Sequence, residues 1–174
     1  MSISKKAYEY HERMFPGYES KLAKTDPEFI ELFDNFAFDE VVNNDDLDDH
    51  TRMIAILSAL LGCQGIDEFK AMLTAAYHFG VTPVEMKEIV YQGTAYLGIG
   101  RTFPFLHAVN DFCVNEGIQL PLEGQSTTTP QTRLEAGRKA QVDIFGEHMR
   151  DYYKNGQEDA KHINYWLTDN CFGD

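Results

Sequence analysis

The sequence lacks the long apolar runs of membrane proteins and of secretory signals. Its longest apolar stretch, residues 53–63, is interrupted by Ser58 and Gly62, and a membrane helix needs roughly 18 consecutive apolar residues. Residues 1–15 are charged and amphipathic, and no apolar segment follows their lysines, as it would in a signal peptide. We therefore expect a soluble protein of the cytoplasm.

Basic residues and cysteines are also scarce. The chain has 15 lysines and arginines against 28 acidic residues, a net charge of −13. Such a chain repels phosphate backbones and anionic lipids, so we expect neither nucleic acid nor membrane as a partner. The 3 cysteines are widely spaced and form no Cys/His cluster. This pattern predicts free thiols in a reducing compartment, with no zinc site and no disulfide framework.

Apolar residues, by contrast, are sufficient for a packed core. They make up 43% of the chain and recur at helical spacing. The pattern predicts an all-α protein in which helices 49–62 and 66–79 form an antiparallel core pair. Pro27 and the Thr82-Pro83 pair mark helix starts. The expected helices are 3–14, 27–38, 49–62, 66–79, 83–96, 101–116, 131–145, 147–154 and 159–172.

An acidic stretch separates the second and third of these helices. It runs from Asp39 to Asp49 and lacks the central glycine and terminal glutamate of an EF-hand loop, so we expect no calcium site. Acidic side chains suit helix N-termini. The stretch is therefore predicted to be a solvated loop that caps the helix after it.

The end of the chain repeats features of its beginning. Phe145-Gly146 corresponds to Phe15-Pro16-Gly17, and INYWLTDNCFGD (163–174) corresponds to FIELFDNFAFDE (29–40). This predicts a helical unit at 1–120, a linker at 121–130 and a tail at 131–174 that resembles the start of a second, incomplete unit. The apolar faces of the tail need cover, from the core helices of the same chain or from another subunit. We expect a homo-oligomer.

One segment resembles a known family. Residues 80–98 read GVTPxExxEIxxQxxxYxG after a helix of small residues, with Arg52 before it and Arg101 after it. The unit 49–109 is similar to the carboxymuconolactone decarboxylase family, whose fold is shared with alkylhydroperoxidase D. The tail segments LEAGRKAQVDIFG and NCFGD resemble the start of the second unit in two-unit members.

The resemblance implies an alkylhydroperoxidase D-like helical bundle that assembles into trimers or hexamers. One branch of the family is a lyase of aromatic degradation that decarboxylates 4-carboxymuconolactone without a cofactor. The other branch reduces peroxides through a CxxCxxH motif. Here Met72 holds the histidine position, and Ile66 and Phe69 hold the cysteine positions. A dithiol mechanism needs two thiols in one turn, and methionine cannot transfer a proton.

The remaining candidates for chemistry lie within the same unit. Glu68 lies one turn before Met72 and would suit proton transfer in apolar surroundings; otherwise it is a surface residue. His107 would supply the missing acid or base, unless it is merely packed. Tyr96 would donate to a substrate carbonyl or pack in the core, and Arg101 would bind a carboxylate or an acidic side chain. Met72 would contribute to the substrate pocket.

These residues predict a cofactor-independent decarboxylase of a small carboxylated lactone or related acid, with no metal. The alternative is a catalytically degenerate member that binds a small molecule or a partner as an oligomer. The third hypothesis is a single-thiol redox role for Cys63. A thiol-dependent peroxidase acting through the CxxCxxH motif is disfavoured, because both cysteines of that motif are replaced.

Overall fold

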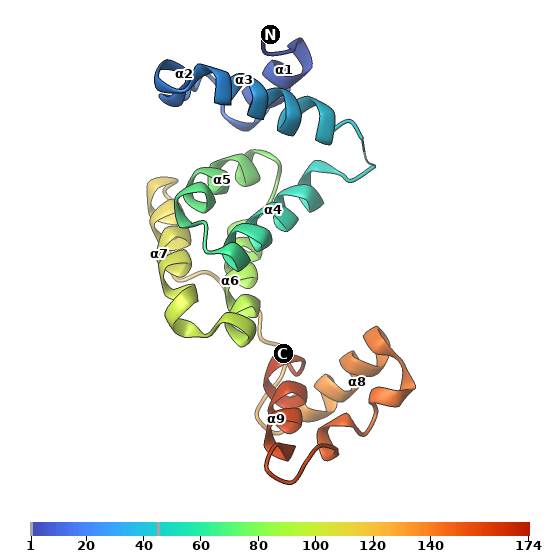
Figure 1. Cartoon of the computed structure of the whole chain (residues 1–174). Coiled ribbons are helices and arrows are strands. Elements are labelled where there is room, and N and C mark those ends of the chain that lie inside the picture. The colour runs from blue at the N-terminus through green and yellow to red at the C-terminus, as the bar shows by residue number, and fades with distance from the viewer. Residues whose placement is uncertain (1, 45) are drawn as a thin grey trace. The chain divides into compact units, whose positions relative to one another are not determined.

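The computed structural model describes residues 2–44 and 46–174, and within these ranges the chain is helical and has no strand (Figure 1). The prediction of an all-α bundle of the alkylhydroperoxidase D type is confirmed. The chain divides into two units, Met1–Leu122 and Glu123–Asp174, which we call unit 1 and unit 2. No helix of the described residues is both long and apolar enough to cross a membrane.

Four helices make the core of unit 1: α4 (Asp49–Cys63), α5 (Ile66–His78), α6 (Pro83–Leu97) and α7 (Ile99–Asn115). They form a ring, because α4 packs on α5 and α6, and α7 also packs on both of these helices. Each contributes large side chains that are almost fully buried: Met53, Leu57, Phe69, Leu73, Met86, Val90, Phe105 and Val109.

The helix ends follow from local chemistry, with two corrections to the predicted bounds. Thr82 and Glu85 form the expected capping box at the start of α6. The helix α4 runs through Gly62 to Cys63 and is ended by Gln64, whose backbone is left-handed with φ 63°. The helix α7 begins at Ile99 and runs through Gly100, so only Gly98 breaks the chain there.

Four shorter elements precede the core: α1 (Lys5–Met14), α2 (Leu22–Thr25), α3 (Pro27–Asn35) and the π-helix η1 (Phe36–Val41). Asp39 and Glu40 lie in η1, so the prediction that the acidic loop starts at Asp39 was wrong. Asp45 of that stretch lies outside the described residues. Asp48 accepts the backbone N–H of Thr51 at 2.9 Å, which confirms that the stretch caps the next helix.

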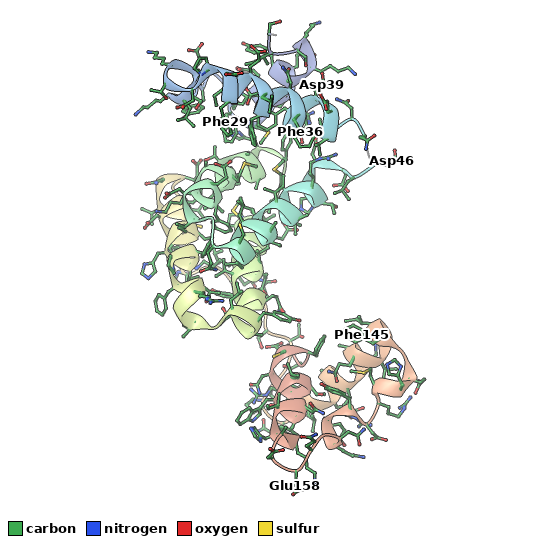
Figure 2. All side chains as sticks on the ribbon, in the orientation of Figure 1. Phe29, Phe36, Asp39, Asp46, Phe145 and Glu158 are labelled. Atoms are coloured by element: carbon green, nitrogen blue, oxygen red, sulfur yellow. The ribbon has the colours of Figure 1, made fainter. Side chains whose placement is uncertain are left out.

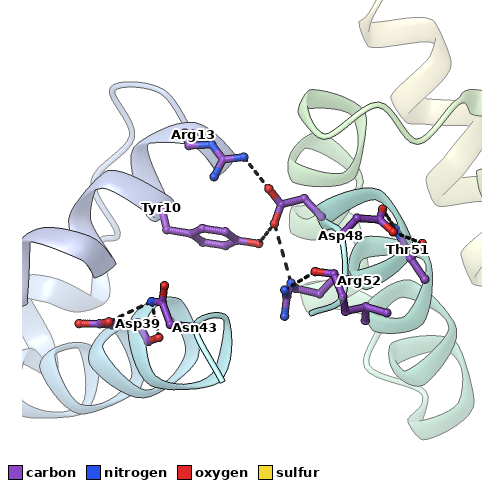
Figure 3. A network of polar contacts seen from close by, with 9 residues as sticks. Tyr10, Arg13, Asp39, Asn43, Asp48, Thr51 and Arg52 are labelled. Carbon is purple, nitrogen blue, oxygen red and sulfur yellow. Dashed lines mark hydrogen bonds and ion pairs between the residues drawn. The ribbon is translucent and has the colours of Figure 1, made fainter. Parts of the chain in front are cut away.

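A network of polar contacts joins α1 to the start of α4 (Figure 3). The Tyr10 hydroxyl donates to Asp49 Oδ1 at 2.8 Å, and Arg13 Nη2 donates to Asp49 Oδ2 at 2.5 Å. Arg52 is buried and donates to the Leu47 carbonyl at 2.7 Å. Asp49 therefore holds the N-terminal helix against the core.

Unit 2 comprises α8 (Arg133–Phe145), the 3-10 turns η2 (Glu147–Met149) and η3 (Tyr152–Lys154), α9 (Lys161–Trp166) and the π-helix η4 (Leu167–Cys171). The predicted helix 147–154 was wrong, because this segment makes two separate turns. The predicted helix 159–172 is shorter and changes to π geometry at Leu167. Within the unit, α8 packs on η4 and α9 packs on η3.

Candidate functional site

A cavity of about 550 Å³ lies between α4 and α6. On α4 its wall is formed by one helical face, because the residues are spaced by three or four positions. The facing wall on α6 has the same spacing. We call this space the α4–α6 cavity, and its lining residues are Ile54, Ser58, Leu61, Gly62, Glu85, Glu88, Ile89, Gln92, Gly93, Tyr96 and Leu97.

A glycine of α6 faces a leucine of α4 in this cavity. A Cβ added at Gly93 would lie 2.5 Å from Leu61 Cδ2. This is closer than side-chain carbons approach each other, so a larger residue at position 93 would require the Leu61 side chain to move. Gly93 therefore makes room for Leu61 in the wall of the cavity.

The polar side chains of the cavity are concentrated on α6. Glu88, Gln92 and Tyr96 recur every four residues and so form a row along one face of the helix. The residues of α4 that line the cavity are apolar apart from Ser58. The cavity thus pairs an apolar wall on α4 with a row of groups on α6 that can form hydrogen bonds.

Glu85 at one end of the α6 wall is held as a carboxylate. Its Oε2 accepts the backbone N–H of Thr82 at 2.7 Å, and its Oε1 lies 3.1 Å from Nε2 of His50. The Thr82 hydrogen bond and the neighbouring His50 lower the pKa of Glu85 below its usual range. Glu85 is accordingly suited to pairing with a positive group, and Glu88 is left as the candidate acid.

The structure places the predicted site residues in different parts of unit 1. Tyr96 lines the cavity and is 78% exposed at its rim. Arg101 is exposed on the first turn of α7, just past the Gly98 turn that ends α6.

The other predicted site residues do not line the cavity. Glu68 is exposed at the start of α5. His107 is exposed on α7, with its ring 5.4 Å from that of Phe103. Met72 is buried in the core.

Sequence reasoning did not select Glu88, Gln92 or Ser58 as functional residues. The signal was present for two of them, since Glu88 and Gln92 share helical spacing with Tyr96. Ser58 lies on another helix, and only the packing of α4 on α6 brings it to the same cavity.

The cysteines lie apart from one another. Cys63 is exposed at the end of α4, Cys113 is buried in α7 and Cys171 is half-buried in unit 2. Burial raises the pKa of the Cys113 thiol, which makes it a poor nucleophile. Phe69, at one of the cysteine positions of the peroxidase motif, packs edge-on against Phe105 with ring centroids 4.9 Å apart. This position serves the core.

Comparisons with known proteins point to one family. Residues 27–111 match the model of the carboxymuconolactone decarboxylase family. The chain is similar to a 4-carboxymuconolactone decarboxylase of Acinetobacter baylyi, with 29% identity over 91 residues that cover 52% of this chain and 68% of that protein. No solved structure gives a significant match. The matched region runs from α3 into α7 and contains every residue that lines the cavity.

Proposed function

Because the chain belongs to the carboxymuconolactone decarboxylase family, we propose that it decarboxylates a small carboxylated lactone or related acid in the α4–α6 cavity, without a cofactor. The observation that carries the proposal is the row of Glu88, Gln92 and Tyr96 facing an apolar wall. The name of the similar bacterial protein supports the choice of reaction.

The apolar wall favours loss of carbon dioxide. A carboxylate carries a localised charge, whereas the transition state spreads that charge into the electron sink of the substrate. Contact with an apolar wall therefore destabilises the starting carboxylate more than the transition state. The lining of the cavity by Ile54, Leu61, Ile89 and Leu97 is the feature that provides this environment.

The row on α6 provides the polar groups that the reaction needs. The Tyr96 hydroxyl and the Gln92 amide would donate hydrogen bonds to the lactone carbonyl, where negative charge develops. Glu88 would deliver a proton to the carbon that has lost carbon dioxide and would regain one from water. Glu88 takes this role in place of Glu68 and His107, because neither of those residues lines the cavity.

A carboxylate that the substrate keeps through the reaction needs a positive partner, whereas a positive group on the departing carboxylate would offset the effect of the apolar wall. No lysine or arginine is among the residues that line the cavity. Arg101 follows Tyr96 and Leu97 after the Gly98 turn, and its side chain is exposed on the first turn of α7. We assign it the retained carboxylate, at the Tyr96 end of the cavity.

The test is carbon dioxide release from 4-carboxymuconolactone by the purified full chain. We expect Glu88→Gln to lower kcat by about 100-fold or more, the usual size of a general-acid contribution. Glu68→Gln is the matched control and should keep wild-type kcat. A Glu88→Gln protein as active as wild type, or an equal loss in Glu68→Gln, would show that the acid lies elsewhere.

A second candidate is a binding protein that has lost catalysis. It is favoured by the buried Met72 at the histidine position of the family. Calorimetry would separate the two hypotheses, because a binding protein takes up the lactone and releases no carbon dioxide. The cytoplasmic location and the trimer or hexamer implied by the family stay predictions.

A further inference from the structure

The two walls of the α4–α6 cavity offer different chemistry to a ligand. The polar row of Glu88, Gln92 and Tyr96 lies on α6. On α4 the hydroxyl of Ser58 donates to the Ile54 carbonyl at 2.8 Å, so its O–H is already used within the helix. The two helices pack on each other, and Figure 2 shows their side chains as sticks. A ligand therefore meets hydrogen-bonding groups on one side and an apolar surface on the other.

A glycine leaves part of the α4 wall open. Gly62 lies within α4 and lines the cavity. A Cβ built on it would meet no heavy atom of the described residues within 4 Å, apart from the backbone of its own helix and its two chain neighbours. Gly93 differs, because a Cβ there would lie 2.5 Å from Leu61 Cδ2. Glycine is unfavourable inside a helix, and Gly62 lacks the packing reason that Gly93 has. The space beside Gly62 is thus open to a ligand.

This open space lies at the Leu97 end of the cavity. Leu61, the residue before Gly62, faces Gly93, and a Cβ on Gly93 would also lie 4.0 Å from Leu97 Cδ1. Tyr96, at whose end of the cavity the proposed function holds the retained carboxylate, directly precedes Leu97. A ligand held by its polar part on α6 therefore has the space beside Gly62 across from it.

The cavity is also larger than a single small ring requires. Its volume of about 550 Å³ lies in the range of ~300–1,000 Å³ that encloses drug-sized ligands. A carboxylated lactone with one five-membered ring is smaller than such a ligand. It would satisfy the polar row on α6 and leave much of the apolar wall facing water, a contact that costs free energy.

From these observations we propose that the substrate of the α4–α6 cavity is an amphipathic acid, in which the carboxylated lactone or related acid also carries an apolar alkyl or aryl arm. The polar part faces α6 and the arm lies against the α4 wall, beside Gly62. Gly62 is then a specificity-determining residue, because a larger side chain would occupy the place of the arm. The acid part of this ligand rests on the proposed function, whereas the arm rests on the α4 wall alone.

The test is a binding experiment that isolates the arm. The probes are 5-oxooxolane-3-carboxylate and its 2-butyl derivative, which share a carboxylated lactone ring and differ only in the arm. Neither has an electron sink beside the carboxylate, so both report binding without decarboxylation. In calorimetry with the full chain, the butyl compound should bind about 10-fold or more tightly than the parent, because each methylene buried on an apolar wall favours binding.

Substitutions of Gly62 locate the arm. Gly62→Leu fills the space beside α4 and should lower the ratio of the two affinities from about 10-fold to about 1. Ala59→Leu places the same side chain on an exposed part of α4 outside the cavity and should keep the wild-type ratio. Gly62→Ala is a milder variant in case Gly62→Leu misfolds. It should unfold at higher urea than wild type, because it removes a helical glycine, and it should reduce the ratio in part.

The possible results separate this inference from the proposed function. Equal affinities of wild type for the two probes, or a ratio that survives in the Gly62 variants, would overturn the arm. An equal loss of both probes in Gly62→Leu keeps the ratio, so it would overturn the arm as well. A wild type that binds neither probe would overturn both proposals. The wild-type ratio and its loss in Gly62→Leu, with no carbon dioxide released from 4-carboxymuconolactone, would support the arm and contradict the proposed reaction.

Discussion

The two units bury different kinds of residue. Unit 1 encloses large apolar side chains such as Phe69 and Phe105, both 1% exposed or less. In unit 2 the most buried side chains are polar: Gln141 is 1% exposed, Thr168 is 0% exposed and Asp169 is 3% exposed. Its large apolar residues, Ile144, Phe145, Ile163 and Trp166 among them, are exposed.

From this difference we expect unit 2 to be the less stable of the two units. Burial of apolar surface is the main favourable term in folding, and unit 1 has it. Unit 2 is held by hydrogen bonds, such as the one from Thr168 Oγ1 to Gln141 Oε1 at 2.8 Å. It is also held by the close approach of Gly137 in α8 to the backbone of Thr168 in η4. Hydrogen bonds contribute about 1 kcal/mol each, so unit 2 should open more readily and should gain more from a partner.

The largest effect is expected in the core of unit 1. Phe69→Ala removes a buried ring that contacts Phe105, so it should lower the free energy of unfolding by about 3–5 kcal/mol. Phe145→Ala in unit 2 is the counterpart; its ring contacts Phe172 but is 51% exposed. It should cost about 1 kcal/mol or less. Urea unfolding followed by circular dichroism measures the free energy of unfolding of both variants. Equal losses in the two variants would contradict the view that apolar burial stabilises unit 1 more than unit 2.

A smaller effect should be confined to unit 2. A Cβ at Gly137 would collide with the carbonyl oxygen of Thr168, a backbone atom that cannot move alone. Gly137→Ala should therefore separate α8 from η4, at a cost of about 1–3 kcal/mol. The fluorescence of Trp166 should report opening at lower urea, while the main circular dichroism transition of unit 1 stays in place. A shared shift of both signals would mean that the units unfold together.

A further effect concerns the attachment of α1. Tyr10→Phe removes the hydrogen bond to Asp49 and keeps the ring, so we expect a loss of about 1–2 kcal/mol at pH 7. Burial and the Asp49 carboxylate raise the pKa of Tyr10 above its ordinary value of 10.0. The folded state thus favours the neutral phenol, and this stabilisation is present below pH 10 and declines as the pH rises above it. The gap between wild type and variant should narrow from pH 7 to pH 10.5; a wider gap at high pH would contradict this.

Much of unit 1 could be predicted from the sequence, because its helices carry their own signals. The Thr82-Pro83 cap and the apolar periodicity gave α4, α5 and α6 nearly at their observed bounds. In unit 2 the apolar periodicity is weak. The segment 147–154, predicted as one helix, forms the two turns η2 and η3, which pack on different helices, α8 and α9. The π-helices η1 and η4 could not be predicted either, because a short π-helical segment hardly changes the spacing of apolar residues along a helix.

The candidate site was harder to predict than the fold. The motif GVTPxExxEIxxQxxxYxG pointed to α6, but the residues chosen for chemistry were scattered over α5, α6 and α7. Which residues share a cavity depends on how α4 packs on α6, and no spacing within one helix contains that information. Glu68 and Glu88 have the same side chain, and only their position relative to the cavity separates them.

The most direct test of the site is hydrogen–deuterium exchange of the full chain with and without 4-carboxymuconolactone. Binding in the α4–α6 cavity predicts slower exchange in the two segments that form its walls, residues 54–62 and 85–97. Protection at the start of α5 around Glu68 or along α7 around His107, with none in α4 and α6, would contradict the account.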